Sequence, residues 1–404
     1  MVSIGTKASK PCPLCGEDKS IIFFEMHNIP CNCNLLWQTR EEAINCPKGD
    51  LTLGYCPSCT FIANYTLQPE KNQYIGQYDN SLYHSHLFQY FAKNKVQSLI
   101  DKYNLHGKTV MEATVGKVDF LSFFCSLGSN KGIKFDTSFI NSLEGSKKDI
   151  IPVDYNSLTE DSDSGRANNE PVDFVFSYHE LEHANSPRHF LNILKERIGK
   201  NSETIFYISV PHIIKAFHEG DFTDVIYEHP SYFTSSALLL LFTSCGYNII
   251  DIREETGVFS SSLSVVASLN KDLFPKFDKN HELEPIEKAT SEFGIKTKML
   301  MTNATRNIKH LLDQGKRIVM WGAGARGVTL LNIFKDDRIK YVIDINPSKQ
   351  GKFLPGTAQK IMAPDFLVTY KPDYVFIANS VYKEEIAKLL RDLNVKSELL
   401  TLTD

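Results

Sequence analysis

The sequence predicts an α/β protein with a small cysteine-rich unit followed by two doubly wound units. Three observations predict this class. Two C-x-x-C pairs lie in the first 75 residues, strand-like and helix-like runs alternate through the middle of the chain, and a strand, a G-x-G-x-x-G turn, a helix and a strand follow residue 316. We expect a zinc-binding domain at 1–75, a central doubly wound domain at 76–270, a helical connector at 271–315 and a Rossmann-like domain at 316–404.

The composition is that of an ordinary globular protein. The chain has 404 residues, 42% hydrophobic and 23% charged, with a formal net charge of −4. Without a basic excess we expect no nucleic-acid partner, and without a run of 18 apolar residues we expect no membrane span. The N-terminus lacks the apolar segment of a signal peptide, so we expect a cytoplasmic protein with reduced thiols. Nothing in the sequence predicts the oligomeric state.

The cysteine pairs predict a structural metal site. Cys12 and Cys15 form one C-x-x-C pair, Cys56 and Cys59 form the other, and residues 16–55 lie between them. Four thiolates at such spacings can close a tetrahedral Zn²⁺ site that stabilises a small domain. The insert contains three more cysteines, which we expect to be buried or free thiols rather than ligands: Cys31, Cys33 and Cys46.

The central unit alternates strands with helices, as a mostly parallel sheet requires. We expect strands at 109–113, 132–136, 150–153, 172–177, 204–210, 249–254 and 261–268, and a polar loop at 157–169. We expect helices at 87–103, 118–127, 187–198 and 232–245.

The first two strands of this unit end in residues typical of S-adenosylmethionine enzymes. Such an enzyme needs an acidic residue and a glycine-rich turn after the first strand, and a carboxylate for the ribose after the second. The candidate cofactor contacts are Glu112, Gly116, Lys117, Asp119 and Asp136.

Two positions of this turn depart from the pattern. Thr114 and Val118 stand where glycine is expected, and a β-branched residue is costly where a turn needs positive φ or a ligand lies against the backbone. The turn therefore binds the cofactor in an altered pocket or holds a different ligand.

The fourth strand runs into a histidine-rich turn at the sheet edge where doubly wound folds bind ligands. Ser177, His179 and His183 lie in this turn, and we expect contacts to cofactor or substrate from them. Residues 179–183 also read H-E-x-x-H, but a zinc protease needs both histidines on one continuous helix and a third ligand. A strand-to-helix turn does not fit that requirement.

A loop before the helix expected at 232–245 gathers three titratable groups. Tyr227, Glu228 and His229 suit proton abstraction next to a carbonyl, with His229 as base, Glu228 orienting it and a tyrosine stabilising the enolate. The alternative is a surface loop whose aromatic residues belong to the core.

The C-terminal unit contains the least ambiguous motif. Gly322, Gly324 and Gly327 form a G-x-G-x-x-G turn between a strand and a helix, and Asp344 ends the next strand. This arrangement predicts binding of a nucleotide diphosphate, with the acidic residue near the ribose. Alternatively the glycines serve only helix–strand packing.

Together these motifs resemble the three-domain sugar C-methyltransferases that act on nucleotide-linked 4-keto-deoxysugars, and related class I methyltransferases. The resemblance covers essentially the whole chain. It rests on the paired C-x-x-C, the strand end at Glu112 and the W-G-A-G-A-R-G turn. It also rests on the segments 78–81, 181–183 with Pro187, 226–229 with 231–233, 344–347, 349–351 and 355–357.

The resemblance implies a central S-adenosylmethionine domain and a nucleotide-sugar substrate held between the lobes. By position it makes His229 the base, with Glu228, Tyr227, Tyr78 and His183 around the reacting carbon. The chain also departs from the family, with residues 209–211 reading S-V-P in place of E-x-P and one histidine fewer at 226–229. Two alternatives therefore stay open: a tailoring enzyme, such as an epimerase or isomerase, that does not use the methyl donor, and a non-catalytic paralogue that binds a nucleotide-sugar.

Overall fold

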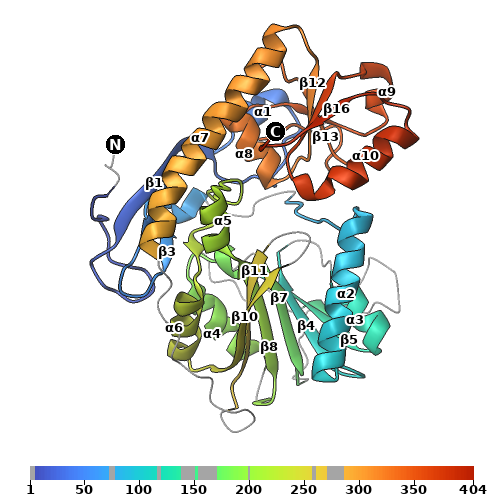
Figure 1. The fold of residues 1–404 in the computed structure, drawn as a ribbon. Helices are drawn as coiled ribbons and strands as arrows, with labels where there is room; N and C mark the ends of the chain where they lie inside the picture. The colour runs from blue at the N-terminus through green and yellow to red at the C-terminus, as the bar shows by residue number, and fades with distance from the viewer. Residues whose placement is uncertain are drawn as a thin grey trace.

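The computed structural model describes residues 5–71, 78–115, 120–137, 151–152, 171–198, 201–256, 261–270 and 286–404. Within these ranges the strands form three sheets (Figure 1). The central sheet lies below the C-terminal sheet in this view, and the N-terminal strands lie to one side of both. The polar loop expected at 157–169 falls outside the described residues.

The N-terminal sheet is antiparallel and takes one strand from the middle of the chain. Its order is β1-β2-β3-β9. The strands are β1 Ile21–Pro30, β2 Lys48–Tyr55, β3 Ile62–Asn64 and β9 Ser231–Tyr232, with the short helices α1 Arg40–Ile44 and η1 Pro69–Lys71 nearby in sequence.

One expected helix therefore starts later than predicted. The helix expected from residue 232 is α6 Ser235–Ser244, and Thr234 caps it by accepting a hydrogen bond from the Ala237 amide. Tyr232 instead pairs with Ile62 of β3. The apolar residues at 232–233 fit a helical period, but a pairing with a strand far away in sequence overrides it.

The central sheet is doubly wound, in the order β10-β11-β8-β7-β4-β5-β6. The strands β8, β7, β4 and β5 pair in parallel, while β6, β10 and β11 are antiparallel. The bounds are β4 Thr109–Thr114, β5 Lys131–Asp136, β6 Ile151–Pro152, β7 Phe174–Tyr178, β8 Ile205–Pro211, β10 Asn248–Thr256 and β11 Ser261–Ser268. The strand order reverses between β4 and β7, which is where open α/β sheets bind ligands.

Helices cover both faces of this sheet (Figure 1). On one face, α2 and α3 pack an aromatic core that includes Phe88, Phe124 and Phe176, while α4 and α6 pack on the other face. The helices of this unit are α2 His86–Tyr103, α3 Leu121–Gly128, η3 Leu181–His183, α4 Pro187–Arg197 and α5 Ile213–Glu219.

The C-terminal sheet is parallel throughout, in the order β14-β13-β12-β15-β16. Its bounds are β12 Ile318–Trp321, β13 Tyr341–Ile343, β14 Lys360–Met362, β15 Tyr374–Ile377 and β16 Glu398–Leu400. Its helices are α8 Ala325–Phe334, α9 Phe366–Tyr370, η4 Ser380–Tyr382 and α10 Lys383–Asp392. The order reverses between β12 and β15, so this sheet also has a ligand-binding edge beside its glycine turn.

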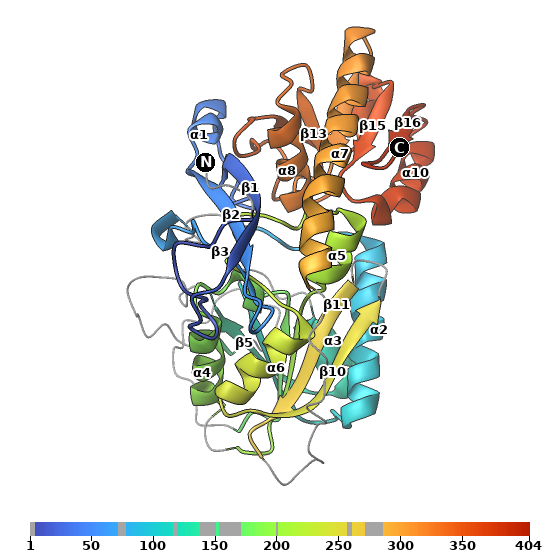
Figure 2. The same cartoon turned by 60° about the vertical axis from the view of Figure 1, so that its left-hand side comes forward.

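The segment expected to be a helical connector contains one long helix that also packs. Helix α7, Ile286–Asp313, runs beside α5 and β1 (Figure 2). Its Phe293 ring lies 4.3 Å from the Phe217 ring and 4.9 Å from the Phe24 ring, measured between centroids. These contacts fix the helix against the N-terminal sheet and the central unit.

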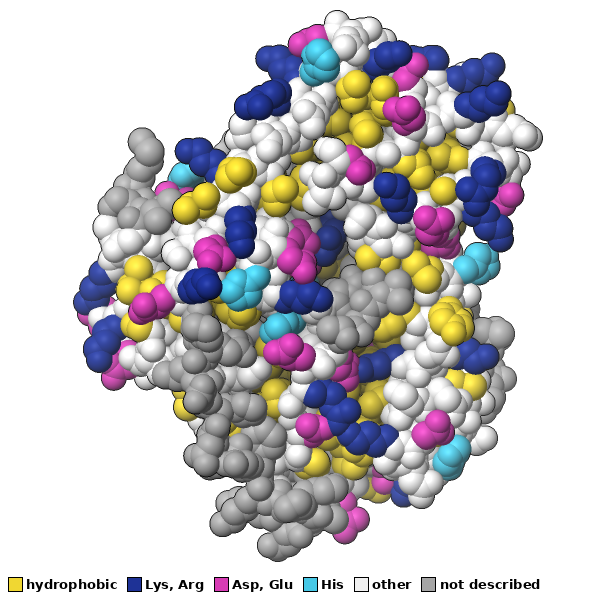
Figure 3. Space-filling model, viewed as in Figure 1, with side chains coloured by type: hydrophobic (Ala, Val, Ile, Leu, Met, Phe, Trp, Pro, Cys, Tyr) yellow, Lys and Arg dark blue, Asp and Glu magenta, His cyan; other side chains and the backbone are white. Residues whose placement is uncertain are grey.

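Charged side chains of both signs are interspersed over the face shown in Figure 3. Among the helices that the structure describes, none combines the length and the apolar character needed to cross a membrane.

Candidate active site

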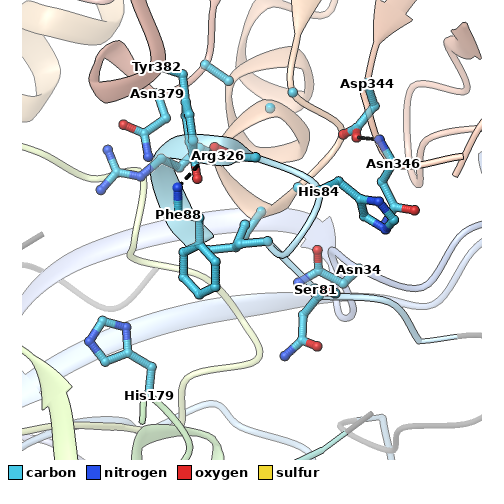
Figure 4. Close-up of a pocket in the computed structure, with 18 of the residues that line it drawn as sticks. Asn34, Ser81, His84, Phe88, His179, Arg326, Asp344, Asn346, Asn379 and Tyr382 are labelled. Carbon is cyan, nitrogen blue, oxygen red and sulfur yellow. Dashed lines mark hydrogen bonds between the residues drawn. The ribbon is translucent and has the colours of Figure 1, made fainter. Parts of the chain in front are cut away.

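A cavity of about 570 Å³ lies at the edge of the central sheet and is closed on its other side by the glycine turn of the C-terminal sheet. Figure 4 shows Arg326, Asn379 and Tyr382 on one side of it, Asp344 and Asn346 on the other, and His179 on the central unit. Ten of the residues predicted from the sequence line this cavity: Tyr78, Glu112, His179, His183, Glu228, His229, Gly322, Gly324, Gly327 and Asp344.

Two other predicted cofactor contacts lie near the cavity without lining it. Asp136 ends β5 beside Thr114, so its carboxylate lies at the same sheet edge. Ser177 is fully buried in β7 and does not line the cavity, so the predicted contact from its side chain is not supported. Gly116, Lys117 and Asp119 fall outside the described residues.

Tyr227 faces away from the site, contrary to the predicted role beside the reacting carbon. Its ring is fully buried and lies against Gly49 of β2, and its hydroxyl accepts a hydrogen bond of 2.8 Å from the Gln68 amide. This side chain belongs to the N-terminal core. For Tyr227 the structure therefore agrees with the alternative interpretation, in which the aromatic residues of the loop are core residues.

Each glycine of the C-terminal turn has a different environment. Gly322 has φ of +110°, which favours glycine, and a Cβ at Gly327 would lie 1.9 Å from the Gly322 carbonyl oxygen. A Cβ at Gly324 would meet nothing closer than the Asn34 side chain at 3.8 Å. The first glycine thus serves the turn, the third serves packing, and the second leaves the backbone open to a ligand.

Asp344 already has two backbone partners. One carboxylate oxygen accepts a hydrogen bond of 2.8 Å from the Ala323 amide and the other accepts one of 2.8 Å from the Asn346 amide. It therefore holds the glycine turn against the end of β13, and a ribose would have to share these oxygens.

Glu112 also braces a turn. Its carboxylate accepts a hydrogen bond of 2.6 Å from the Leu121 amide at the start of α3. It thereby ties the end of β4 to the first turn of the following helix.

A carboxylate that the sequence did not single out spans the end of β4. Glu180 accepts hydrogen bonds from the Thr114 hydroxyl at 2.8 Å, the Val115 amide at 3.1 Å and the Thr137 hydroxyl at 3.4 Å. Burial raises the pKa of Glu180 to about 8 despite these bonds. Thr114, which replaces an expected glycine, is thus a partner of this buried acid.

Glu228 is held by the N-terminal insert rather than by its neighbour His229. Its carboxylate accepts hydrogen bonds from the Cys33 amide, the Asn34 amide and the Tyr78 hydroxyl, the last at 3.4 Å. The predicted orienting contact to His229 is therefore wrong. Burial raises the pKa of Glu228 to about 7, and the three hydrogen bonds oppose that rise.

His229 is oriented by a backbone carbonyl. Its Nδ1 lies 2.9 Å from the Asp224 carbonyl oxygen, and because a carbonyl can only accept, Nδ1 carries the proton. The His183 ring lies edge-on, with its centroid 4.5 Å from that of His229. Burial lowers the pKa of His229 to about 3, so the imidazole is neutral at physiological pH.

His179 is placed in the left-handed region, with φ of +55°. Its ring stacks on Tyr178 and its Nε2 lies 3.0 Å from the Ser262 hydroxyl. The two histidines of the H-E-x-x-H sequence therefore do not share a helix face, as expected for this turn.

The sequence analysis did not single out the charged residues that join the units across the cavity. Arg326, inside the glycine turn, forms ion pairs with Asp224 at 2.8 Å and Asp221 at 3.2 Å. These partners raise its pKa, although burial opposes the rise. The only available signal was an arginine within the G-x-G-x-x-G turn, where a smaller residue would suffice.

The four predicted zinc ligands come together. Cys12 Sγ lies 3.6 Å from Cys59 Sγ, Cys15 Sγ lies 3.6 Å from Cys56 Sγ, and all four sulfurs lie within 4.8 Å of one another. Zn–S bonds of about 2.3 Å at tetrahedral angles place sulfurs roughly 3.8 Å apart, so the donor set fits such an ion. The other three cysteines of this region are buried and free: Cys31, Cys33 and Cys46.

Comparison with known families points to one class of protein. Residues 278–398 match the family model described as the C-methyltransferase C-terminal domain. This match contains α7, the glycine turn and all strands of the C-terminal sheet except the last two residues of β16.

A curated relative belongs to the same class. The C-methyltransferase NovU of Streptomyces niveus is 25% identical over 199 residues, which cover 45% of this chain and 46% of that protein. The similarity thus spans about half the length of the relative.

Two solved structures are similar to part of the chain. The magnesium protoporphyrin IX methyltransferase ChlM of Synechocystis PCC 6803 with bound SAH is 13% identical, covering 48% of this chain and 90% of its own, with a TM-score of 0.31. A SAM-dependent methyltransferase of Aquifex aeolicus is 16% identical, covering 44% and 90%, with a TM-score of 0.30. At these scores neither structure supports a conclusion about the site.

Proposed function

We propose that the protein is a C-methyltransferase that moves a methyl group from S-adenosylmethionine to the carbon beside the ketone of a nucleotide-activated keto-deoxysugar. The observation that carries this proposal is a cavity lined by the edges of the central and C-terminal sheets at which their strand orders reverse, and by Glu228 and His229. The match of residues 278–398 to a C-methyltransferase domain and the similarity to NovU support the same activity.

The nucleotide diphosphate would lie against the glycine turn. The backbone at Gly324 is open, and Gly324 caps the ten-residue helix α8, whose first amides can bind an anion. Asp344 already accepts hydrogen bonds from the Ala323 and Asn346 amides, so it would hold the turn in place. One of its oxygens would accept a further hydrogen bond from a ribose hydroxyl.

The methyl donor fits the residues at the edge of the central sheet. S-adenosylmethionine supplies the methyl group when bound, and it carries an ammonium group and a ribose diol. Asp136, at the end of β5, would accept the ribose hydroxyls, and the buried carboxylate of Glu180 would pair with the ammonium group. Glu112 would tie the end of β4 to the start of α3 through the hydrogen bond that it accepts from the Leu121 amide.

Glu228 is the better proton acceptor of the two neighbouring candidates. Two backbone amides and the Tyr78 hydroxyl fix its carboxylate, which lines the cavity. Burial disfavours the charged form of His229, which makes that imidazole a poor base for a weakly acidic C–H. The Tyr78 hydroxyl can then donate to the oxygen on which negative charge develops.

The zinc ion would have a structural part. The four thiols leave no open position for a substrate, and their knuckles pack into the core shared with α4 and α6. The Thr60 hydroxyl, next to Cys59, lies 2.6 Å from the hydroxyl of Thr234, the cap of α6. A metal there would stabilise this core, which lies next in sequence to the loop that carries Glu228 and His229.

A second function is favoured by one observation. At the end of β4, where the methyl donor would lie, the Thr114 hydroxyl and the Val115 amide already donate hydrogen bonds to Glu180. An epimerase or isomerase of a similar sugar would keep Glu228 and dispense with the donor.

One experiment separates these functions. Purified protein is titrated calorimetrically with S-adenosylmethionine and S-adenosylhomocysteine, and then incubated with nucleoside-diphosphate 4-keto-6-deoxyhexoses in deuterated water. A methyltransferase binds the donor and releases S-adenosylhomocysteine only when the sugar is present. Deuterium uptake beside the ketone without donor binding identifies the second function. If the protein shows neither methyl transfer nor deuterium uptake, both functions are contradicted.

A further inference from the structure

Three potential metal ligands meet on the central-unit wall of the cavity. The short helix η3 carries Glu182 and His183, and the loop before β9 carries His229. One ligand atom from each lies within 4.8 Å of the others. This cluster is separate from the four cysteines in sequence and differs from them in chemistry.

Among the residues that the structure describes, none provides a counter-charge for Glu182. It is 2% exposed, it lines the cavity, and neither of its carboxylate oxygens accepts a hydrogen bond from another described residue. Glu180 and Asp224 are close enough to disfavour a second negative charge. A buried carboxylate without a hydrogen bond or counter-ion is strongly unfavourable, so this position calls for a cation or a proton.

Both imidazoles are held as metal ligands usually are. His229 donates Nδ1–H to the Asp224 carbonyl, and His183 is hydrogen-bonded to the backbone of Glu228. The carbonyl on Nδ1 fixes the tautomer of His229 and makes its Nε2 the nitrogen that can bind a metal. The two rings lie edge to face, at 81° to each other, and a nitrogen of each lies within 4.8 Å of the other and of a Glu182 oxygen.

We propose that Glu182, His183 and His229 form a second metal site, which binds a divalent transition ion such as Zn²⁺, Co²⁺ or Ni²⁺. Two imidazoles and one carboxylate suit these ions, and the cavity leaves a fourth position open. Bonds of about 2.1 Å at tetrahedral angles need ligand atoms roughly 3.4 Å apart, which small side-chain movements can reach from atoms that lie within 4.8 Å of one another.

The site differs from the zinc-protease arrangement of the same sequence motif. That arrangement uses both histidines of H-E-x-x-H on one helix face. Here His179 stacks on Tyr178 and bonds Ser262, and a histidine from a distant loop takes its place. Metal binding does not depend on the proposed methyl transfer. In a keto-sugar complex the open position would accept the carbonyl oxygen, where a cation stabilises enolate charge.

The test is metal binding by the full-length protein with its cysteine site filled. Co²⁺ is titrated in a calorimeter and followed by absorption, and bound metal is counted by mass spectrometry. We expect a second equivalent whose spectrum lacks thiolate charge-transfer bands. Glu182→Gln and His229→Asn should weaken this second equivalent at least tenfold while the cysteine-bound metal is kept.

His179→Asn is the matched control, because it changes a half-buried histidine of the same motif and asparagine tolerates its positive φ. It should keep both equivalents. The proposal is overturned if wild type binds one equivalent only, if the second shows thiolate bands, or if Glu182→Gln binds it as tightly as wild type. Because glutamine is nearly isosteric with glutamate, Glu182→Gln should fold even if His229→Asn does not. Near-ultraviolet circular dichroism of Glu182→Gln checks this fold, and its metal affinity then decides the test.

Discussion

The Arg326 guanidinium donates a hydrogen bond of 2.8 Å to the Asp224 carboxylate, and this ion pair joins the glycine turn to the loop of the candidate base. The carbonyl of the same Asp224 holds Nδ1 of His229. One residue of the loop therefore positions an imidazole with its backbone and anchors the C-terminal unit with its side chain.

Arg326→Gln should lower the stability of the protein because it leaves Asp224 and Asp221 without their cation. For side chains that are about a quarter exposed we expect a loss of about 2–3 kcal/mol in the free energy of unfolding, measured with urea. The control is Arg338→Gln, which breaks ion pairs with Asp336 and Asp313 on the surface and should have no measurable effect. If the two substitutions lower the free energy of unfolding equally, the ion pairs of Arg326 do not stabilise the protein more than surface ion pairs do.

Glu228→Gln should abolish proton abstraction while the ligands still bind. Loss of a general base costs about 10²- to 10⁴-fold in rate. The measurements are deuterium exchange beside the ketone of the sugar and S-adenosylhomocysteine release, with ligand affinity from calorimetry. Glu219→Gln, an exposed acid at the end of α5, is the control and should keep full activity. If the rate of deuterium exchange beside the ketone is unchanged in Glu228→Gln, then Glu228 is not the base.

The glycine turn offers a matched pair of substitutions. Gly327→Ala should destabilise the C-terminal unit by about 1–3 kcal/mol or more, because its Cβ would collide with the Gly322 carbonyl. Gly324→Ala has room for its Cβ and should fold normally, but it should weaken binding of a nucleoside diphosphate if the diphosphate approaches this backbone. Thermal unfolding and calorimetric titration measure the two effects. Full nucleotide affinity in folded Gly324→Ala would favour the packing interpretation of the motif.

Removal of the cysteine-bound metal should destabilise the protein. Cys56→Ser breaks the four-thiolate set and should lower both the metal content and the melting temperature, since the knuckles share a core with α4 and α6. Cys125→Ser lies outside the cluster and serves as the control. A Cys56→Ser protein with unchanged metal content would rule out this ligand set.

The Lys95–Glu255 ion pair should make stability depend on pH. Burial favours the neutral acid, but Lys95 and the Tyr207 hydroxyl outweigh it and lower the pKa of Glu255. Because this pKa is lowered on folding, the stabilisation is present above the unfolded value of about 4.3 and is lost as the pH falls through the folded value. Glu255→Gln should cost about 1–3 kcal/mol at pH 7, and the difference should shrink below pH 4. A constant difference measured by denaturant unfolding at both pH values would argue against this origin.

The local patterns predicted most of the two doubly wound units. The glycine turn, Asp344 and the closing pair β10–β11 follow from residues that are near in sequence, so period and turn chemistry suffice. The cysteine spacings likewise predicted which four sulfurs meet.

The failures of prediction come from contacts between distant segments. Glu228 bonds the Cys33 amide 195 residues away, Tyr227 turns into the N-terminal sheet, and β9 pairs with β3. No local pattern encodes these choices, because each depends on how the N-terminal unit packs against the central unit. The buried acids Glu180 and Glu182 were missed because their sequence does not show that the turn after β7 is buried against other elements.

The most direct test of the central claim is transfer of a labelled methyl group. S-adenosylmethionine with a ¹³C-methyl group is incubated with the protein and a nucleoside-diphosphate 4-keto-6-deoxyhexose, and the product is examined by NMR. The proposal predicts a labelled methyl carbon coupled directly to a ring carbon beside the ketone, and its absence in Glu228→Gln. A label on oxygen or nitrogen, or no transfer to any keto-deoxysugar despite donor binding, would contradict it.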